Sequence, residues 1–123
     1  MKIRQIQSLM EADLLTGEDE LDSDVFSACA SDMMSDVLAF VKDQGVLITG
    51  LVNPQVIRTA AMMDMRCIVF VRGKNPGEDI ISLGESAGIV IMASKLRMYE
   101  ACGRLYDAGL HGGEIITPEE QNG

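Results

Sequence analysis

The sequence lacks the short motifs that mark the commonest nucleotide-dependent and hydrolytic enzymes. It contains no GxxxxGK[ST] phosphate loop, no GxSxG nucleophile turn and no HExxH zinc helix. Its single histidine, His111, stands in a glycine-rich stretch near the C-terminus, so we do not expect a histidine general base. From these absences we expect a protein that is not an enzyme and that carries neither a cofactor nor a metal ion.

Basic residues are also scarce. Ten Lys and Arg stand against nineteen Asp and Glu in 123 residues, which gives a net charge of −9. Such a chain repels the phosphate backbone of nucleic acids and anionic lipid, so neither a nucleic acid nor a membrane surface is an expected partner. No apolar run approaches the roughly 20 residues that cross a bilayer.

Cysteine pairs with redox or metal-binding spacing are missing too. Cys29, Cys67 and Cys102 are an odd number with no CxxC spacing, and acids stand in the N-terminal segment where a signal peptide would be apolar. These features predict a cytoplasmic protein with reduced thiols. Because each cysteine has apolar neighbours, we interpret all three as small buried hydrophobes rather than as metal ligands or redox groups.

A repeated strand, loop and helix pattern fills the second half of the chain. Apolar strands are predicted over residues 46–49, 67–71 and 89–92. The first two lead into Asn-Pro pairs, in which Asn53 and Asn75 are predicted N-caps with proline at the first helical position. Ser94 is the predicted cap of the third helix, which we expect over residues 95–108 with a stop at Gly109.

The first half of the chain predicts two further helices and two strands. Ile3, Ile6, Leu9 and Met10 recur at helical spacing. Ser31 or Asp32 is expected to cap a second helix with apolar positions through Val41. Short strands are expected over residues 13–16 and 25–30, with a solvated acidic loop over residues 18–24 between them.

This alternation of apolar strands and helices indicates an α/β fold with three layers and a mainly parallel sheet of about five strands. The length fits one domain, which we place at residues 1–110. Residues 111–123 lose the periodicity and are predicted to form a flexible or partner-docking tail.

A ligand crevice in such a sheet lies at the carboxyl ends of the strands, where helix N-termini also point. The cations and the N–H groups at that edge predict a site for a small anion, such as a nucleotide phosphate or a carboxylate. The competing interpretation is that these residues only form turns, cap helices and face solvent. The candidate ligand-binding residues are Ser31, Asp32, Thr49, Gly50, Asn53, Arg72, Gly73, Lys74, Asn75, Ser94 and Lys95.

A carboxylate pair offers a third interpretation. Asp32 and Asp36 are spaced i and i+4 on one predicted helix face, a pattern that suits acid–base chemistry or a divalent metal. Acids in the first turn of a helix also complement its dipole, which is the simpler explanation.

Several segments together resemble the small stand-alone DRTGG-domain proteins, over roughly residues 2–110. The segments that carry the resemblance are residues 30–40 (ASDMMSDVLAF), 47–50 (LITG), 53–60 (NPQVIRTA) and 68–74 (IVFVRGK). The resemblance implies the fold of the N-terminal domain of HPr kinase/phosphorylase. DRTGG domains also occur as regulatory inserts in some phosphotransacetylases and inorganic pyrophosphatases.

The resemblance further implies a homodimeric regulatory domain that accompanies catalysis performed elsewhere and is not itself a kinase. It makes a redox or hydrogen-metabolism context plausible, with a protein partner in a redox or signalling system. We therefore expect a non-catalytic regulatory module that senses a small nucleotide-like or phosphate-bearing anion. The alternative is a ligand-free homodimeric adaptor or assembly protein for a hydrogenase-associated redox system.

Overall fold

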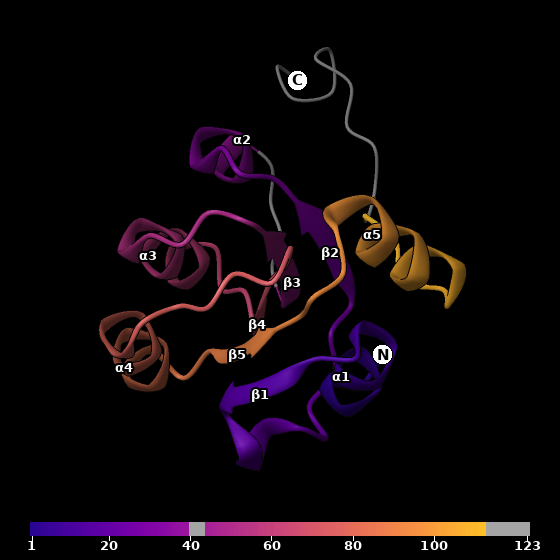
Figure 1. Ribbon diagram of the computed structural model, residues 1–123, viewed down its shortest axis with the longest axis horizontal. Coiled ribbons are helices and arrows are strands. Elements are labelled where there is room, and N and C mark those ends of the chain that lie inside the picture. The colour runs from indigo at the N-terminus through magenta and orange to yellow at the C-terminus, as the bar shows by residue number, and fades with distance from the viewer. Residues whose placement is uncertain (40–43, 113–123) are drawn as a thin grey trace, which may run out of the picture.

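The computed structural model describes residues 1–39 and 44–112, in which helices and strands alternate along most of the chain (Figure 1). The elements are α1 (Ile3–Met10), β1 (Asp13–Thr16), the 3₁₀-helix η1 (Glu18–Glu20), β2 (Ser27–Ala30), α2 (Met34–Ala39), β3 (Gly45–Thr49), α3 (Pro54–Met62), β4 (Cys67–Phe70), α4 (Glu78–Ala87), β5 (Val90–Ala93) and α5 (Met98–Asp107).

The strands form one five-stranded sheet in the order β1-β5-β4-β3-β2. Strands β2, β3, β4 and β5 run parallel to their neighbours, and β1 closes one edge antiparallel to β5. This confirms the predicted α/β fold with a mainly parallel sheet of five strands.

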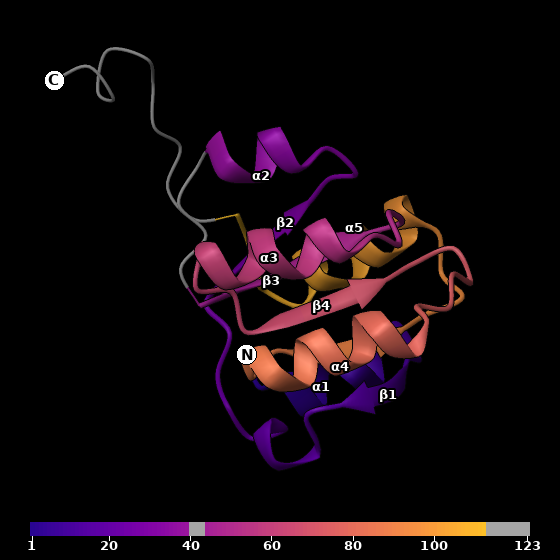
Figure 2. The same ribbon diagram turned by 90° about the vertical axis from the view of Figure 1, so that its left-hand side faces the viewer.

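The order of the strands determines which face of the sheet each helix covers. Strands β2 to β5 succeed one another in both sequence and space, so right-handed crossovers carry α2, α3 and α4 to the same face. The opposite face is covered by α1 and α5, the helices that precede and follow the strand series (Figures 1 and 2). The result is the predicted three-layer arrangement.

The central strands β3 and β4 are buried along their whole length because helices cover both faces of the sheet. Their side chains alternate between two apolar clusters. Leu47, Ile68 and Phe70 pack toward α3 and α4, whereas Ile48 and Val69 pack toward α1 and α5. This double burial holds the carboxyl ends of β3 and β4 in fixed positions.

The predicted start of helix α4 is wrong. Helix α4 begins at Glu78 with Gly77 at its N-cap, not at Pro76 with Asn75 as the cap. Pro76 is buried in the preceding loop, and Glu78 and Asp79 form an acidic first turn that favours a helix start there. The first repeat matches its prediction, because Asn53 caps α3 and Pro54 opens it.

The cysteines only partly match the expected burial. Cys67 is fully buried, and burial raises the pKa of its thiol to about 12, so this thiol stays protonated at neutral pH. Cys29 and Cys102 are only partly buried. Over the described part of the chain, no helix is long and apolar enough to cross a membrane.

The beginning of the predicted tail lies beside strand β2. The carbonyl of His111 accepts a hydrogen bond from Ala28 N–H at 2.9 Å. The imidazole ring of His111 stacks on the ring of Tyr106, with the ring centroids 4.2 Å apart. Residues 113–123, which make up the rest of that tail, lie outside the described residues.

Candidate functional site

The connections that leave the neighbouring strands β4 and β5 run to opposite faces of the sheet, because α4 covers one face and α5 the other. The crevice of an open α/β sheet is expected at such a point. Here the two loops are tied together: Arg72 N–H donates to Leu96 O at 2.7 Å, and Gly73 N–H donates to Ser94 O at 3.0 Å. Those backbone donors are therefore engaged within the protein and are not free to bind a ligand.

Polar side chains turn the backbone just after the carboxyl ends of the parallel strands. In each of these turns, a side-chain oxygen accepts a hydrogen bond from the N–H two residues later, which satisfies a donor that the strand leaves unpaired. The pairs are Ser31 with Met33 at 3.0 Å, Thr49 with Leu51 at 3.1 Å, Asn53 with Gln55 at 2.8 Å and Ser94 with Leu96 at 3.1 Å. These local bonds give Ser31 and Asn53 a structural role.

Three donors from two other segments converge on the carboxylate of Asp32. Gly50 N–H donates to its Oδ1 at 2.7 Å, and Thr49 Oγ1 donates to the same oxygen at 3.1 Å. Arg72 Nη2 donates to Oδ2 at 3.2 Å, in an ion pair whose side chains are 44% and 40% exposed for Arg72 and Asp32. We call Asp32, Thr49, Gly50 and Arg72 the Asp32 cluster.

The cluster favours the charged form of Asp32. Partial burial pushes the pKa of this carboxyl upward, but the hydrogen bonds from Gly50 and Thr49 and the positive charge of Arg72 outweigh it. The net effect lowers the pKa of Asp32 below its ordinary value. Asp32 is thus an anion held by a backbone amide, a hydroxyl and a guanidinium.

Arg72 adopts an unusual backbone conformation to take part in this cluster. Its φ is +64° and that of Gly73 is +70°, in a turn closed by a hydrogen bond from Lys74 N–H to Val71 O. A left-handed conformation costs a non-glycine residue about 1–2 kcal/mol. A Cβ at Gly50 would overlap the Arg72 guanidinium, so any other residue there would push the Arg72 side chain away from its present position. Such strain, held by surrounding contacts, is typical of functional sites.

The remaining candidate residues do not join the Asp32 cluster. Lys74 and Asn75 are exposed in the loop between β4 and α4. Lys95 is exposed on the other side of the β5–α5 loop, where it lines a hollow of about 280 Å³ with Glu11 and Asp13.

Ser94 has a structural role, and the prediction that it caps α5 is wrong. The helix begins at Met98 with Arg97 at the N-cap. Ser94 is only 1% exposed, and its Oγ donates to Met10 O at 2.6 Å, which links the β5–α5 loop to the end of α1. The sequence could not reveal this role, because the partner is 84 residues away.

We predict that Ser94→Ala lowers the free energy of unfolding by about 1–3 kcal/mol, since it leaves the Met10 carbonyl without its buried donor. Ser31→Ala is the matched control: it removes a similar turn hydroxyl that bonds only within its own turn, and we expect a loss of about 0.5–1 kcal/mol. Urea unfolding followed by circular dichroism measures both. Equal losses in the two variants would contradict the role assigned to Ser94.

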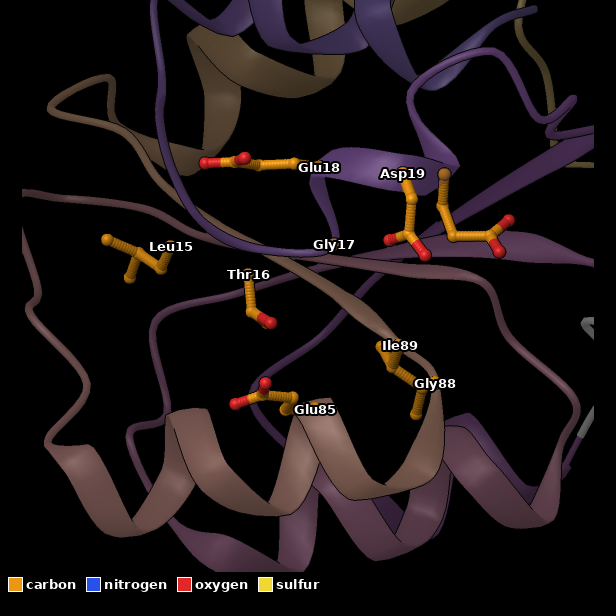
Figure 3. A pocket seen from close by; sticks show the side chains of 9 residues that line it. Leu15, Thr16, Gly17, Glu18, Asp19, Glu85, Gly88 and Ile89 are labelled. Carbon is orange, nitrogen blue, oxygen red and sulfur yellow. The ribbon is translucent and has the colours of Figure 1, made fainter.

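An acidic hollow that the sequence alone does not predict lies at the opposite end of the sheet (Figure 3). Its volume is about 480 Å³, and Glu18, Asp19 and Glu20 of η1 line it together with Glu85 of α4. The acidic run was expected to face solvent, and only the fold brings Glu85 to it. Four carboxylates make this hollow unsuited to an anion.

The paired-carboxylate interpretation gains no geometric support. Asp32 is engaged by Thr49, Gly50 and Arg72, and Asp36 is exposed on α2. Among the residues that the structure describes, no group of three or more His, Cys, Asp or Glu side chains is placed to hold a metal ion.

Comparison with known proteins agrees with the fold. A family model described as the DRTGG domain matches residues 5–108. Among solved structures, the chain is similar to the crystal structure of the CBS and DRTGG domains of the regulatory region of Clostridium perfringens pyrophosphatase, complexed with its activator diadenosine tetraphosphate. The TM-score is 0.68 at 12% sequence identity, and the alignment covers 94% of this chain.

That alignment covers 53% of the pyrophosphatase chain, so our chain spans about half of its length. At this identity the likeness establishes the fold alone. No curated protein sequence matches the chain. The family model, in contrast, matches most of the chain, and the protein therefore belongs to the DRTGG domain family.

Proposed function

We propose that the protein is a non-catalytic regulatory module that senses a small anionic ligand, nucleotide-like or phosphate-bearing, at the Asp32 cluster. The observation that carries the proposal is the convergence of a guanidinium, a backbone amide and a hydroxyl on two oxygens of one carboxylate. Carboxylates and phosphates both present two oxygens on one central atom, so this donor set suits either group.

The charges of the molecule support this placement. Arg72 and the exposed Lys74 stand at the carboxyl ends of the strands in a chain whose net charge is −9. The acidic hollow lies at the other end of the sheet. Because Asp32 offsets much of the charge of Arg72, Lys74 is the cation that favours the approach of an anion at this edge, whereas the carboxylates of the hollow repel an anion at the opposite end.

The family supports a regulatory role. The DRTGG domain that this chain resembles belongs to the regulatory region of a pyrophosphatase, and that region was solved with a nucleotide activator. By analogy, our domain reports the presence of a ligand to an enzyme or a protein partner rather than transforming the ligand itself. We place such a protein in the cytoplasm, where nucleotides and phosphorylated metabolites are the abundant anions.

The test is isothermal titration calorimetry of the full chain with inorganic phosphate, pyrophosphate, ATP and diadenosine tetraphosphate. We expect binding of at least one of these anions, weakened at least tenfold in the double variant Arg72→Ala, Lys74→Ala, because a charge-assisted hydrogen bond contributes about 1.5–3 kcal/mol. Arg58→Ala removes an exposed cation on α3 and is the matched control, for which affinity should stay within about twofold.

Unchanged binding in the double variant would contradict the placement of the site, and an absence of binding by all four anions would contradict the proposed function.

The second candidate, a homodimeric adaptor, is favoured by the outer face of α5. There Tyr99 and Tyr106 are 89% and 66% exposed beside a largely apolar hollow that Gly103 also lines. A dimer in sedimentation equilibrium together with no anion binding would favour the adaptor.

A further inference from the structure

We infer that Asp32 is a built-in competitor at this site: its carboxylate occupies the position that an oxyanion of the ligand takes, and ligand binding releases it. This inference rests on the proposed function and adds how the site is regulated. The ligand class that it implies is an oxyanion with two oxygens on one atom, a phosphate or a carboxylate. The released segment is the turn from β2 into α2.

The donors form the fixed half of this arrangement. Thr49 and Gly50 are buried at the end of β3, a strand that is buried throughout. The backbone of Arg72 is held by its hydrogen bond to Leu96 O, directly after the buried end of β4. The backbone of all three donor residues is therefore held by contacts that do not involve Asp32.

Asp32 lies in an exposed turn at the edge of the sheet. It follows β2, the edge strand of the sheet, and precedes α2, which has only six residues. Short helices depend on packing for their stability, and Val37 is the one fully buried side chain that α2 contributes among the described residues. Met33 and Leu38 on either side of it are 61% and 42% exposed. The segment that carries Asp32, the acceptor, is therefore the one that can move away from Thr49 and Gly50.

The strength of the internal contact is low enough for displacement. Arg72 and Asp32 are both more than one-third exposed, so solvent screens their attraction. A phosphate group carries up to twice the charge of one carboxylate and offers more acceptor oxygens to the same donors. An internal competitor lowers the apparent affinity for a ligand by the fraction of time that the donors are free. Removing the competitor should therefore tighten binding.

The test compares the affinity for inorganic phosphate and for pyrophosphate of the full-length wild type, Asp32→Asn and Asp36→Asn. Asp32→Asn weakens the hold on Arg72 because an amide lacks the charge, so we expect its affinity to be at least about fivefold higher than that of the wild type. Asp36→Asn removes the same charge from an exposed position on α2, away from the Asp32 cluster. Its affinity should stay within about twofold of the wild-type value.

A second measurement uses the wild type alone and does not depend on the folding of a variant. Saturating phosphate should speed amide hydrogen exchange in Met34–Ala39 and leave exchange in the buried strand β3 unchanged. Equal affinities in all three proteins, or unchanged exchange in α2, would overturn the competitor and leave the proposed function standing. Loss of binding in Asp32→Asn would make Asp32 a ligand-holding residue, which also overturns the competitor. If the wild type and both variants bind neither phosphate nor pyrophosphate, and the wild type also binds neither ATP nor diadenosine tetraphosphate, the proposed function fails as well.

Discussion

Gly17→Ala is expected to lower the free energy of unfolding by about 3 kcal/mol, the sum of a backbone and a packing penalty. Gly17 links β1 to η1 with a φ of +95°, a conformation that side chains disfavour. A Cβ at this position would also lie 2.6 Å from Val90 Cγ2 and 3.0 Å from Val90 Cα. Val90 is 1% exposed and belongs to β5, so the backbone of the sheet cannot give way cheaply.

Gly109→Ala separates the two penalties. Gly109 has a φ of +102°, close to that of Gly17, but no atom lies within 4 Å of its ideal Cβ. We expect this control to lose only the backbone share, about 1–2 kcal/mol. Urea unfolding of the two variants gives the comparison. Equal losses would mean that β1 and β5 separate easily, which would contradict the tight approach of Gly17 to the sheet.

The elements that the sequence predicts well are those whose signal is local. The apolar runs of β3, β4 and β5 are recognisable without knowledge of their neighbours, because strands covered on both faces are apolar throughout. Asn53 and Pro54 mark the start of α3 by direct contacts with the next few residues. The strand predicted over residues 13–16 ends just before Gly17, whose positive φ does not fit an extended strand.

The roles that sequence reasoning missed depend on distant partners. Asn75 and Pro76 repeat the Asn-Pro pair of the first unit, but burial of Pro76 shifts the start of α4 to Glu78. Arg72 meets an acceptor 40 residues away in sequence. The prediction of an anion site treated Arg72 as a free cation and Asp32 as part of the same site, and it could not foresee that the two side chains pair with each other. Such pairing follows only from the order of strands β2, β3 and β4.

The paired state of Arg72 also changes how the site should be understood. A cation that is free in solution attracts anions at any time, whereas a cation that is already paired responds only to an anion that competes successfully. Because the carboxylate of Asp32 uses both of its oxygens, a ligand with one acceptor oxygen gains little by replacing it. If the proposed site is correct, we expect the Asp32 cluster to select for ligands with several oxygens on one atom.

Phe70→Ala should have the largest effect of the changes considered, with a loss of about 3–5 kcal/mol in the free energy of unfolding. Phe70 is fully buried and heads the largest such side chains of the described residues. It ends β4 and packs in the cluster under α3 and α4. A domain of this size has about 5–15 kcal/mol of stability, so the variant loses a large share of the total.

Phe70 also tests how the sheet supports the Asp32 cluster, because it stands two residues before Arg72 and its carbonyl accepts the N–H of Ser94. Phe70→Leu keeps most of the apolar volume and should lose only about 1–2 kcal/mol, which leaves the variant folded at room temperature. If the end of β4 holds Arg72 in place, Phe70→Leu weakens anion binding by less than tenfold, whereas the double variant of Arg72 and Lys74 weakens it more. Stronger weakening in the folded Phe70→Leu protein than in the double variant would show that packing under β4, rather than the charge of Arg72, controls the site.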